Sequence, residues 1–335
     1  MDQLAPNDAF HAPIVDVLKV RVLVDSFYER FLPPASHQHV EIEHVRQIPG
    51  RQMTTLACEW GLSLHLESHV HHESAQYLVD FGYTPEIINR NFDLLGIEPG
   101  KIKGLILSHA HRDHFGGLAG FVDQYRDVMR EDISLYVGGE EAFREKWIGK
   151  KEKPVSWGHV DRDHLDEKGV CSVCCSKPLS LGQVFTSGYI KRQTFECVTG
   201  GSMVEDKYDH FTNAERQGAL VKDEHPDEHA ACYIIRNKGL VVITSCGHVG
   251  LINTVKTAMH VSGVTKLHAV IGGFHLGTAT PDYISHTVDE LQLLNPDVIL
   301  PMHCSGSGFI DAVRQRMPEK LVTSNVGSRF TFKSQ

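Results

Sequence analysis

Ser108-His109-Ala110-His111-Arg112-Asp113-His114-Phe115-Gly116-Gly117 places three histidines and one aspartate directly after the apolar run Gly104-Leu105-Ile106-Leu107. The apolar run predicts a buried strand. Alternate residues of an extended segment share a face, so His109, His111 and Asp113 point the same way, and His114 joins them if the chain turns after the strand. Gly116-Gly117 then allows close backbone packing before a predicted helix over 118–129.

This clustering of side chains predicts a metal site. Neutral imidazoles and carboxylates are ligands of zinc and similar divalent cations. Four candidate ligands exceed what one cation takes from one short loop, so we predict two adjacent cations, held by His109 and His111 and by Asp113 and His114. A histidine-rich surface loop is the alternative, because the chain has 22 histidines. The tight spacing at a strand end, before two glycines, favours the metal site.

The C-terminal part of the chain repeats one pattern, in which an apolar run is followed by a histidine. The predicted strands cover residues 240–243, 268–271 and 298–300, and the histidines that follow them are His248, His275 and His303. Sites in α/β sheets form at the carboxyl ends of the strands. We therefore expect these histidines to converge on the 109–114 loop.

The spacing His109-x-His111-x-Asp113-His114 resembles the signature of the metallo-β-lactamase superfamily, and Tyr77-Leu78-Val79-Asp80-Phe81-Gly82 is similar to its early strand ending in Asp-x-Gly. Within the superfamily, further segments resemble the dihydropterin ribofuranosyl-aminobenzene phosphate synthases. Those segments are 59–63, 186–192, 244–250, 271–276 and 301–306. Two departures stand out: Trp60 replaces the usual histidine, and Ser245-Cys246-Gly247 reorders the usual Gly-Cys-Ser/Ala.

The resemblance implies an α/β fold, a metallo-β-lactamase-like four-layer αββα sandwich of two mixed sheets. We expect a single domain over residues 18–335, an N-terminal extension over 1–17 and a charged, irregular insertion at about 138–180. His303 resembles the last ligand histidine of the superfamily and completes the second metal site. His275 resembles a histidine that serves as an acid in related nucleases, so we assign His275 and Asp113 as catalytic residues.

The third ligand of the first metal has two candidates. Relatives place a histidine about twenty residues before a strand-end aspartate that bridges the metals, and His225 has that spacing from Cys246, which occupies the aspartate's position. His248 lies in the better-matched segment, and we favour it. Cys246 is a candidate thiolate ligand. Asp80 is expected to orient a ligand imidazole rather than bind metal.

The predicted activity is metal-dependent hydrolysis of an ester-like bond (a phosphoester, a lactone or another activated small molecule) by activated water. The cofactors are two divalent cations, most simply zinc, with manganese or iron as alternatives. A dihydropterin-type synthase, which condenses its pterin with a phosphorylated ribosyl aminobenzene, is the second reading, since a fold does not fix function. A metal-stabilised binding or regulatory module without catalysis is the third, motivated by the missing bridging aspartate.

Composition limits partners and compartment. The formal charge of −9 over 335 residues disfavours a nucleic-acid partner. No apolar run is long enough for a membrane span, and no export signal opens the chain, so we expect a cytoplasmic protein with reduced thiols. We expect a small-molecule substrate, for which an anionic group is one option, and a homodimer is the default assembly. Cys171 and Cys174 with His159 and His164 have spacing that permits a structural zinc, but ordinary thiols are favoured.

Overall fold

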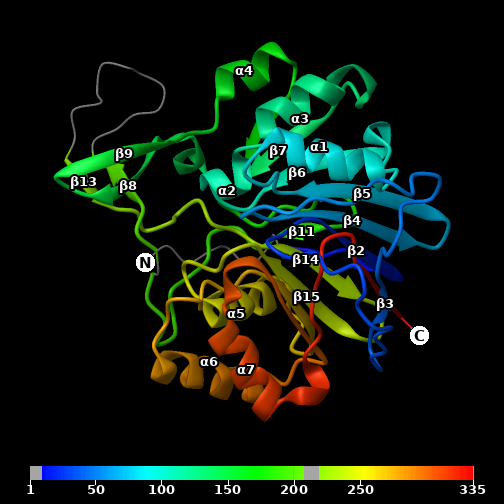
Figure 1. Cartoon of the computed structure of the whole chain (residues 1–335). Helices are drawn as coiled ribbons and strands as arrows, with labels where there is room; N and C mark the ends of the chain where they lie inside the picture. The colour runs from blue at the N-terminus through cyan, green and yellow to red at the C-terminus, as the bar shows by residue number, and fades with distance from the viewer. Residues whose placement is uncertain (1–9, 199, 207–218, 335) are drawn as a thin grey trace.

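Two β-sheets pack face to face and helices cover the outer face of each sheet (Figure 1). The computed structural model describes residues 10–198, 200–206 and 219–334. One apolar core lies between the two sheets. A second lies between the larger sheet and its helices, and a third lies between the smaller sheet and its helices. The predicted four-layer αββα sandwich is confirmed.

The larger sheet has eight strands and mixed pairing. Its spatial order is β10 (Cys171–Cys174), β7 (Ser134–Val137), β6 (Ile102–Leu107), β5 (Glu73–Val79), β4 (Ser63–Val70), β2 (Val17–Val24), β18 (Arg329–Lys333) and β3 (Glu41–Glu43). Pairs from β5 to β10 are parallel, and pairs from β5 to β3 are antiparallel. In β2, Leu18, Val20 and Val22 enter the central core, while Lys19 and Arg21 face outward.

The smaller main sheet has six strands. They are β1 (Ile14–Val15), β14 (Ala231–Ile235), β15 (Gly239–Thr244), β16 (Leu267–Gly272) and β17 (Val298–Pro301), with β11 (Phe185–Thr186) paired to β14. β15, β16 and β17 are parallel. Their residues are almost all buried because both faces of the sheet are covered, which explains the continuous apolar runs. The three strands predicted from those runs are confirmed.

The helices fall into two groups. α1 (Pro85–Leu94), α2 (Arg112–Phe115), α3 (Leu118–Tyr125) and α4 (Arg162–Glu167) lie on the side of the larger sheet. α5 (Leu251–Ser262), α6 (Pro281–Leu294) and α7 (Ser307–Arg316) cover the smaller one. Among the described residues no helix is long and apolar enough to cross a membrane.

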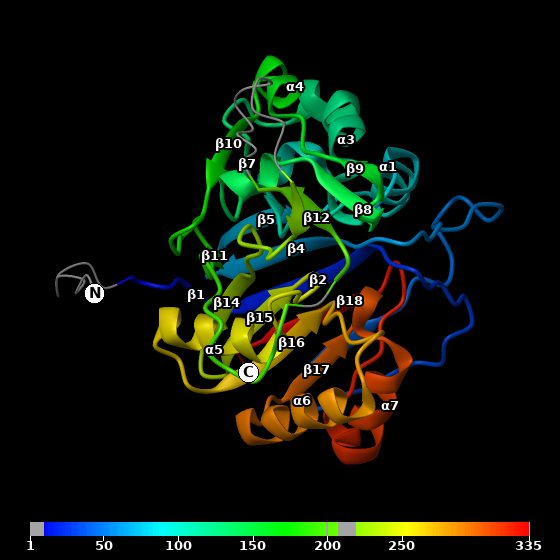
Figure 2. The ribbon, with the colours of Figure 1, turned by 90° about the vertical axis from the view of Figure 1, so that its left-hand side faces the viewer.

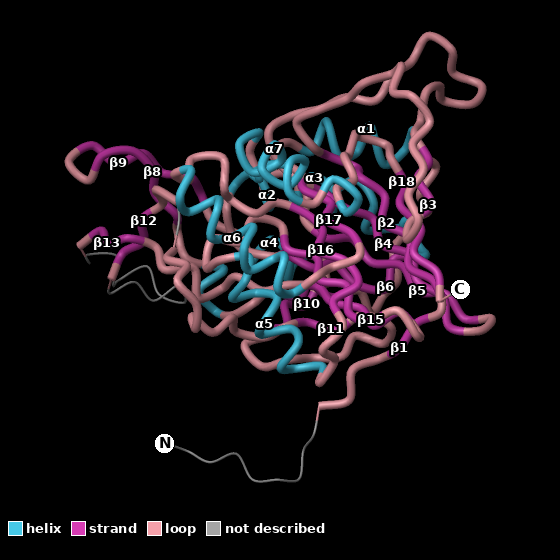
Figure 3. Tube along the Cα trace, turned by 90° about the horizontal axis from the view of Figure 1, so that it is seen from below, coloured by secondary structure: helices cyan, strands magenta, loops and turns pink. Residues whose placement is uncertain are grey.

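A small third sheet projects from one side of the sandwich (Figures 2 and 3). Its order is β13 (Leu220–Lys222), β12 (Met203–Glu205), β8 (Lys146–Lys150) and β9 (Lys153–Gly158). We expected residues 138–180 to be irregular, but they contain the β8–β9 hairpin, α4 and β10. The hairpin escaped prediction because its residues do not alternate between polar and apolar. β10 extends the larger sheet, so the end of this segment belongs to the sandwich.

The start of the chain also differs from the expected extension over 1–17. Ile14 and Val15 form β1 and pair with Ile234 and Ile235 of β14. Residues 1–9 lie outside the described part of the chain. The first strand of the smaller sheet therefore precedes the predicted domain start at residue 18.

Two glycines after β6 bring α2 and α3 close to neighbouring backbone. A Cβ on Gly116 would lie 2.2 Å from the carbonyl oxygen of Tyr83, and one on Gly117 would lie 2.2 Å from that of Phe81. No side chain fits at such distances. The close packing predicted from Gly116-Gly117 is confirmed.

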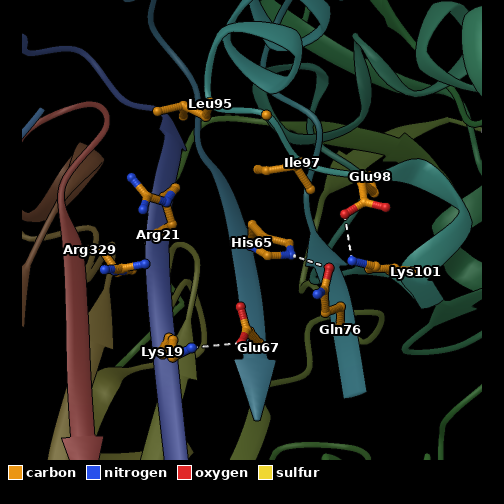
Figure 4. A pocket seen from close by; sticks show the side chains of 11 residues that line it. Lys19, Arg21, His65, Glu67, Gln76, Leu95, Ile97, Glu98, Lys101 and Arg329 are labelled. Atoms are coloured by element: carbon orange, nitrogen blue, oxygen red, sulfur yellow. Dashed lines mark hydrogen bonds and ion pairs between the residues drawn. The ribbon is translucent and has the colours of Figure 1, made fainter. Parts of the chain in front are cut away.

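A polar cavity of about 310 Å³ lies on the outward face of the larger sheet (Figure 4). Lys19 donates to Glu67 and Lys101 donates to Glu98, while Arg329 pairs with Glu43 outside the cavity. The cavity is therefore largely charge-compensated. None of the predicted metal ligands lines it.

Candidate metal centre

The 108–115 segment leaves β6 and turns at once into the short helix α2. His111 is the residue before the helix and keeps an extended backbone, whereas Asp113 and His114 lie in its single turn. This turn brings His114 round to the side of His109, as predicted, with ring centroids 4.3 Å apart. All four candidate ligands of the segment are at least 96% buried.

Three imidazoles form the first cluster. His109, His111 and His248 offer ligand atoms that all lie within 4.8 Å of one another. His109 Nδ1 lies 3.0 Å from Ser108 Oγ, and His111 Nε2 lies 2.8 Å from Ser202 Oγ. These contacts fix both rings, and His109 Nε2 has no hydrogen-bond partner among the described residues.

A mixed cluster lies beside the first. Asp113 Oδ2 is 3.4 Å from His303 Nε2 and 3.8 Å from His114 Nε2. Cys246, just after β15, places its Sγ 3.3 Å from His114 Nε2. The structure thus brings Asp113, His114 and His303 together as predicted and puts the Cys246 thiol beside them.

Asp80 holds the second cluster from behind. Its carboxylate accepts hydrogen bonds from His114 Nδ1 at 2.7 Å and from the Ser108 amide and hydroxyl, each at 2.8 Å. Asp80 is fully buried. The expectation that it orients an imidazole is met by this contact, because the bond fixes the His114 ring with Nε2 toward Asp113 and Cys246.

The pKa values of the histidines differ between the two clusters. Burial and the neighbouring imidazoles keep the pKa values of His109 and His111 well below the ordinary value, so both rings are neutral. Burial opposes charge on His114, but the carboxylates of Asp113 and Asp80 outweigh it and raise the pKa of His114 to about 9. Burial likewise opposes charge on Asp113, yet His114 and His303 lower its pKa.

The donor set fits divalent cations. His109 Nε2, Asp113 Oδ1 and both ring nitrogens of His303 are buried and have no hydrogen-bond partner among the described residues. Buried polar atoms are normally satisfied, so unpartnered atoms on three residues of the two neighbouring clusters favour a bound cation. Imidazole and carboxylate ligands are those that zinc, manganese and iron accept.

His225, the alternative third ligand, also reaches this region. Its ring stacks on His248 at 4.1 Å with an interplanar angle of 10°, but its centroid is 6.2 Å from His109, compared with 4.9 Å for His248. His225 groups instead with His111 and Asp223. The geometry therefore favours His248 over His225 in the first cluster.

Several buried charges around the site escaped sequence reasoning. Lys146 of β8 is 1% exposed and lies 2.8 Å from Asp223 Oδ2 and 3.4 Å from Asp227 Oδ1. Glu228 accepts from the amides of His248 and Val249, each at 2.8 Å, and burial raises its pKa to about 7. The spacing of these residues in the sequence did not indicate a role in the site, because their partners are distant in sequence or are backbone groups.

Cys304 is a further residue of the site that we did not predict from the sequence. Its Sγ lies 3.3 Å from Cys246 Sγ and accepts the His275 amide at 3.2 Å. His275 follows β16 and packs on His248, with ring centroids 4.1 Å apart. The cysteine pair therefore links the ends of β15, β16 and β17.

A cavity of about 300 Å³ opens onto both clusters. It is lined by the ligand candidates Asp113, His111, His248 and His303, together with His275, Cys246 and Cys304. Its walls come from elsewhere in the chain: Trp60, Ile148, Gly149, Trp157 and the 200–202 segment.

The residues considered for a separate structural zinc have other partners. Cys174 Sγ donates to Glu140, His159 Nδ1 lies 2.7 Å from Glu145, and His164 Nε2 lies 3.2 Å from Asp123. Cys171 is exposed. These contacts agree with the favoured reading of ordinary thiols.

Replacing the buried carboxylate tests its positioning role. We expect Asp80→Asn to weaken metal affinity about 10- to 100-fold, because the amide no longer fixes the His114 ring as a charged acceptor does. Competition with a chelator measures the affinity. The control is Asp297→Asn, which alters a comparable Asp–His contact with His268, 2.8 Å long, away from the site. Equal affinities for Asp80→Asn and the unaltered protein would contradict the role.

Removing each candidate third ligand separates the two histidines. We expect His248→Ala to lose metal from the first cluster, because it removes one of three converging imidazoles, and His225→Ala to keep its metal content. Elemental analysis after dialysis gives the equivalents per chain, and circular dichroism checks folding. The assignment is wrong if the metal content falls for His225→Ala and not for His248→Ala.

Comparisons with known proteins identify the family of this chain. A model of the metallo-beta-lactamase superfamily matches residues 70–169. The chain is 30% identical over 250 residues to 7,8-dihydropterin-6-methyl-4-(beta-D-ribofuranosyl)-aminobenzene-5'-phosphate synthase of Methanocaldococcus jannaschii, covering 73% of this chain and 81% of that protein. It is 26% identical over 237 residues to an uncharacterized protein, MJ0448, of the same organism, covering 68% of this chain and 78% of that protein.

One solved structure superposes over almost the whole chain. Tm1679, a metal-dependent hydrolase of the β-lactamase superfamily, aligns with a TM-score of 0.68 at 21% identity, covering 93% of this chain and 98% of that one. This likeness supports the fold. Together with the match to the synthase and the family model, it shows that this chain belongs to the metallo-β-lactamase superfamily.

Proposed function

We propose that this protein is a metal-dependent hydrolase that cleaves an ester-like bond (a phosphoester, a lactone or another activated small molecule) with water. The observation that carries the proposal is the pair of adjacent ligand clusters, which share the floor of one cavity. No serine or cysteine nucleophile is needed for this chemistry.

The ligands proposed for two divalent cations follow from the two clusters. His109, His111 and His248 would hold the first cation, and Asp113, His114 and His303 the second, with the Cys246 thiol as a further donor. Zinc suits this set best, and manganese or iron are alternatives. Bound divalent cations lower the pKa of water and polarise a carbonyl or phosphoryl oxygen.

Two side chains of the cavity have further roles, one in positioning the second cluster and one in protonating the leaving group. The Asp113 carboxylate lies between His114 and His303 and sets the position of the second cluster. His275 lines the cavity without a place in either proposed ligand set, and its Nδ1 is buried with no hydrogen-bond partner among the described residues. We assign it to deliver a proton to the leaving group.

The size of the cavity suits a small molecule. Its volume of about 300 Å³ lies at the lower end of ligand pockets, about 300–1,000 Å³. That space suits one compact substrate and a water molecule. It is small for a condensation that brings two large substrates together.

A dihydropterin-type synthase is the second candidate, and the 30% identity to the synthase of Methanocaldococcus jannaschii favours it. A metal-stabilised binding module is the third, because a cysteine stands where relatives have a bridging aspartate. A metal content well below one equivalent per chain after purification would support the binding module.

Turnover of simple esters tests the hydrolase directly. We expect the protein loaded with zinc or manganese to hydrolyse generic aryl phosphoesters or carboxylic esters, and His111→Ala to abolish turnover because it removes a ligand. His260→Ala, an exposed histidine of α5, is the control for the substitution itself. Silence on every hydrolysable probe at full metal content would leave the synthase standing.

Leaving-group dependence tests His275. We expect His275→Gln to slow hydrolysis of an alkyl phosphoester about 10²- to 10⁴-fold, since an alkoxide needs a proton as it departs. A p-nitrophenyl ester should be affected far less, because p-nitrophenolate leaves unaided. Rates of both substrates in the same preparation give the comparison. Equal losses on both would assign His275 a structural role.

A further inference from the structure

Two tryptophans line the cavity that also contains residues of both ligand clusters. Trp60, in the segment before β4, lies over His303 with ring centroids 4.7 Å apart. Trp157 of β9 lies over His111 with ring centroids 4.8 Å apart. One ring thus covers a ligand of the second cluster and the other covers a ligand of the first.

Trp60 is unusually exposed for so large an apolar side chain. It is 54% exposed although it lines a cavity. Keeping an indole face in water is unfavourable, so exposed aromatic faces beside a site favour an apolar partner. The packing on His303 fixes one side of the ring and leaves the rest available to a ligand.

Trp157 is held in place by its neighbours. Its Nε1 donates to the Tyr83 hydroxyl at 3.4 Å. Its hairpin is anchored by the buried Lys146, which pairs with Asp223 and Asp227 beside the clusters. The ring is therefore presented by a fixed scaffold rather than by a free loop. Ile148 of the same hairpin adds a third apolar wall.

Charge in the cavity comes from its floor. Among the described residues that line it, none is a lysine or an arginine. A substrate with several phosphates would need such cations in addition to the two proposed metals. A single anionic or polar head at the floor, with an apolar group above it, matches the lining.

We propose that Trp60 and Trp157 form an aromatic clamp that selects substrates carrying a flat aromatic group next to the ester-like bond, with one anionic head. The inference rests on the proposed function, since the head must sit at the metal clusters. The aromatic group enters between the two indoles, where offset or edge contacts are favourable. The two tryptophans are specificity-determining residues and take no part in bond cleavage.

Binding of non-hydrolysable ligands tests the clamp. Phenylphosphonate and ethylphosphonate share one head and differ in the group above it. Calorimetry with the zinc-loaded protein should show phenylphosphonate binding about tenfold more tightly. Trp60→Leu and Trp157→Leu should each bring the phenylphosphonate affinity closer to the ethylphosphonate affinity measured for the same variant. Trp147→Leu is the matched control, because Trp147 lies on the same hairpin but does not line the cavity.

The outcomes separate the clamp from the hydrolase. Equal affinities for the two phosphonates, a preference that survives both substitutions, or no binding of phenylphosphonate would overturn the clamp. A retained preference in a protein that hydrolyses no ester would support the clamp and overturn the hydrolase. Melting temperatures of the variants guard against unfolding, and a variant that unfolds is replaced by the Phe substitution, which should weaken the preference less than Leu.

Discussion

The buried carboxylate of Asp80 is the interaction on which the site depends. It stands at the end of β5 with a left-handed backbone, φ 58°, and accepts hydrogen bonds from Ser108 and His114. A buried charge is costly unless donors surround it, and here three donors do so. Because Ser108 Oγ also contacts His109, the same carboxylate braces both ends of the ligand loop and couples the two clusters.

A second buried charge network joins the small third sheet to the site. Lys146 of β8 lies between Asp223 and Asp227, and Asp227 also accepts the Ala110 amide inside the ligand loop at 2.9 Å. Removing one member of such a network leaves an uncompensated buried charge, which costs about 3–5 kcal/mol. The hairpin is therefore fixed relative to the proposed ligands, and its residues Ile148 and Trp157 line the cavity.

The sequence predicted the elements that have a periodic apolar pattern and the site residues that lie close together in the chain. The apolar runs before His109, Cys246, His275 and His303 predicted the strands, and strand ends of a layered α/β fold meet at one edge, so convergence followed. The hairpin that contains Lys146 could not be predicted, because its residues do not alternate between polar and apolar. The ion pairs of Lys146 also join residues 77 and 81 positions apart in the sequence. Cys304 was missed because its contact with Cys246 exists only when β17 lies next to β16.

Chemistry and selectivity come from different parts of the chain. The proposed ligands come from segments that follow β6, β15 and β17 of the two main sheets. The cavity walls come from the segment before β4 and from the β8–β9 hairpin. The match of 30% identity to a synthase supports the shared superfamily, which does not fix the substrate, whereas the substrate proposed above follows from the residues that line this chain's own cavity.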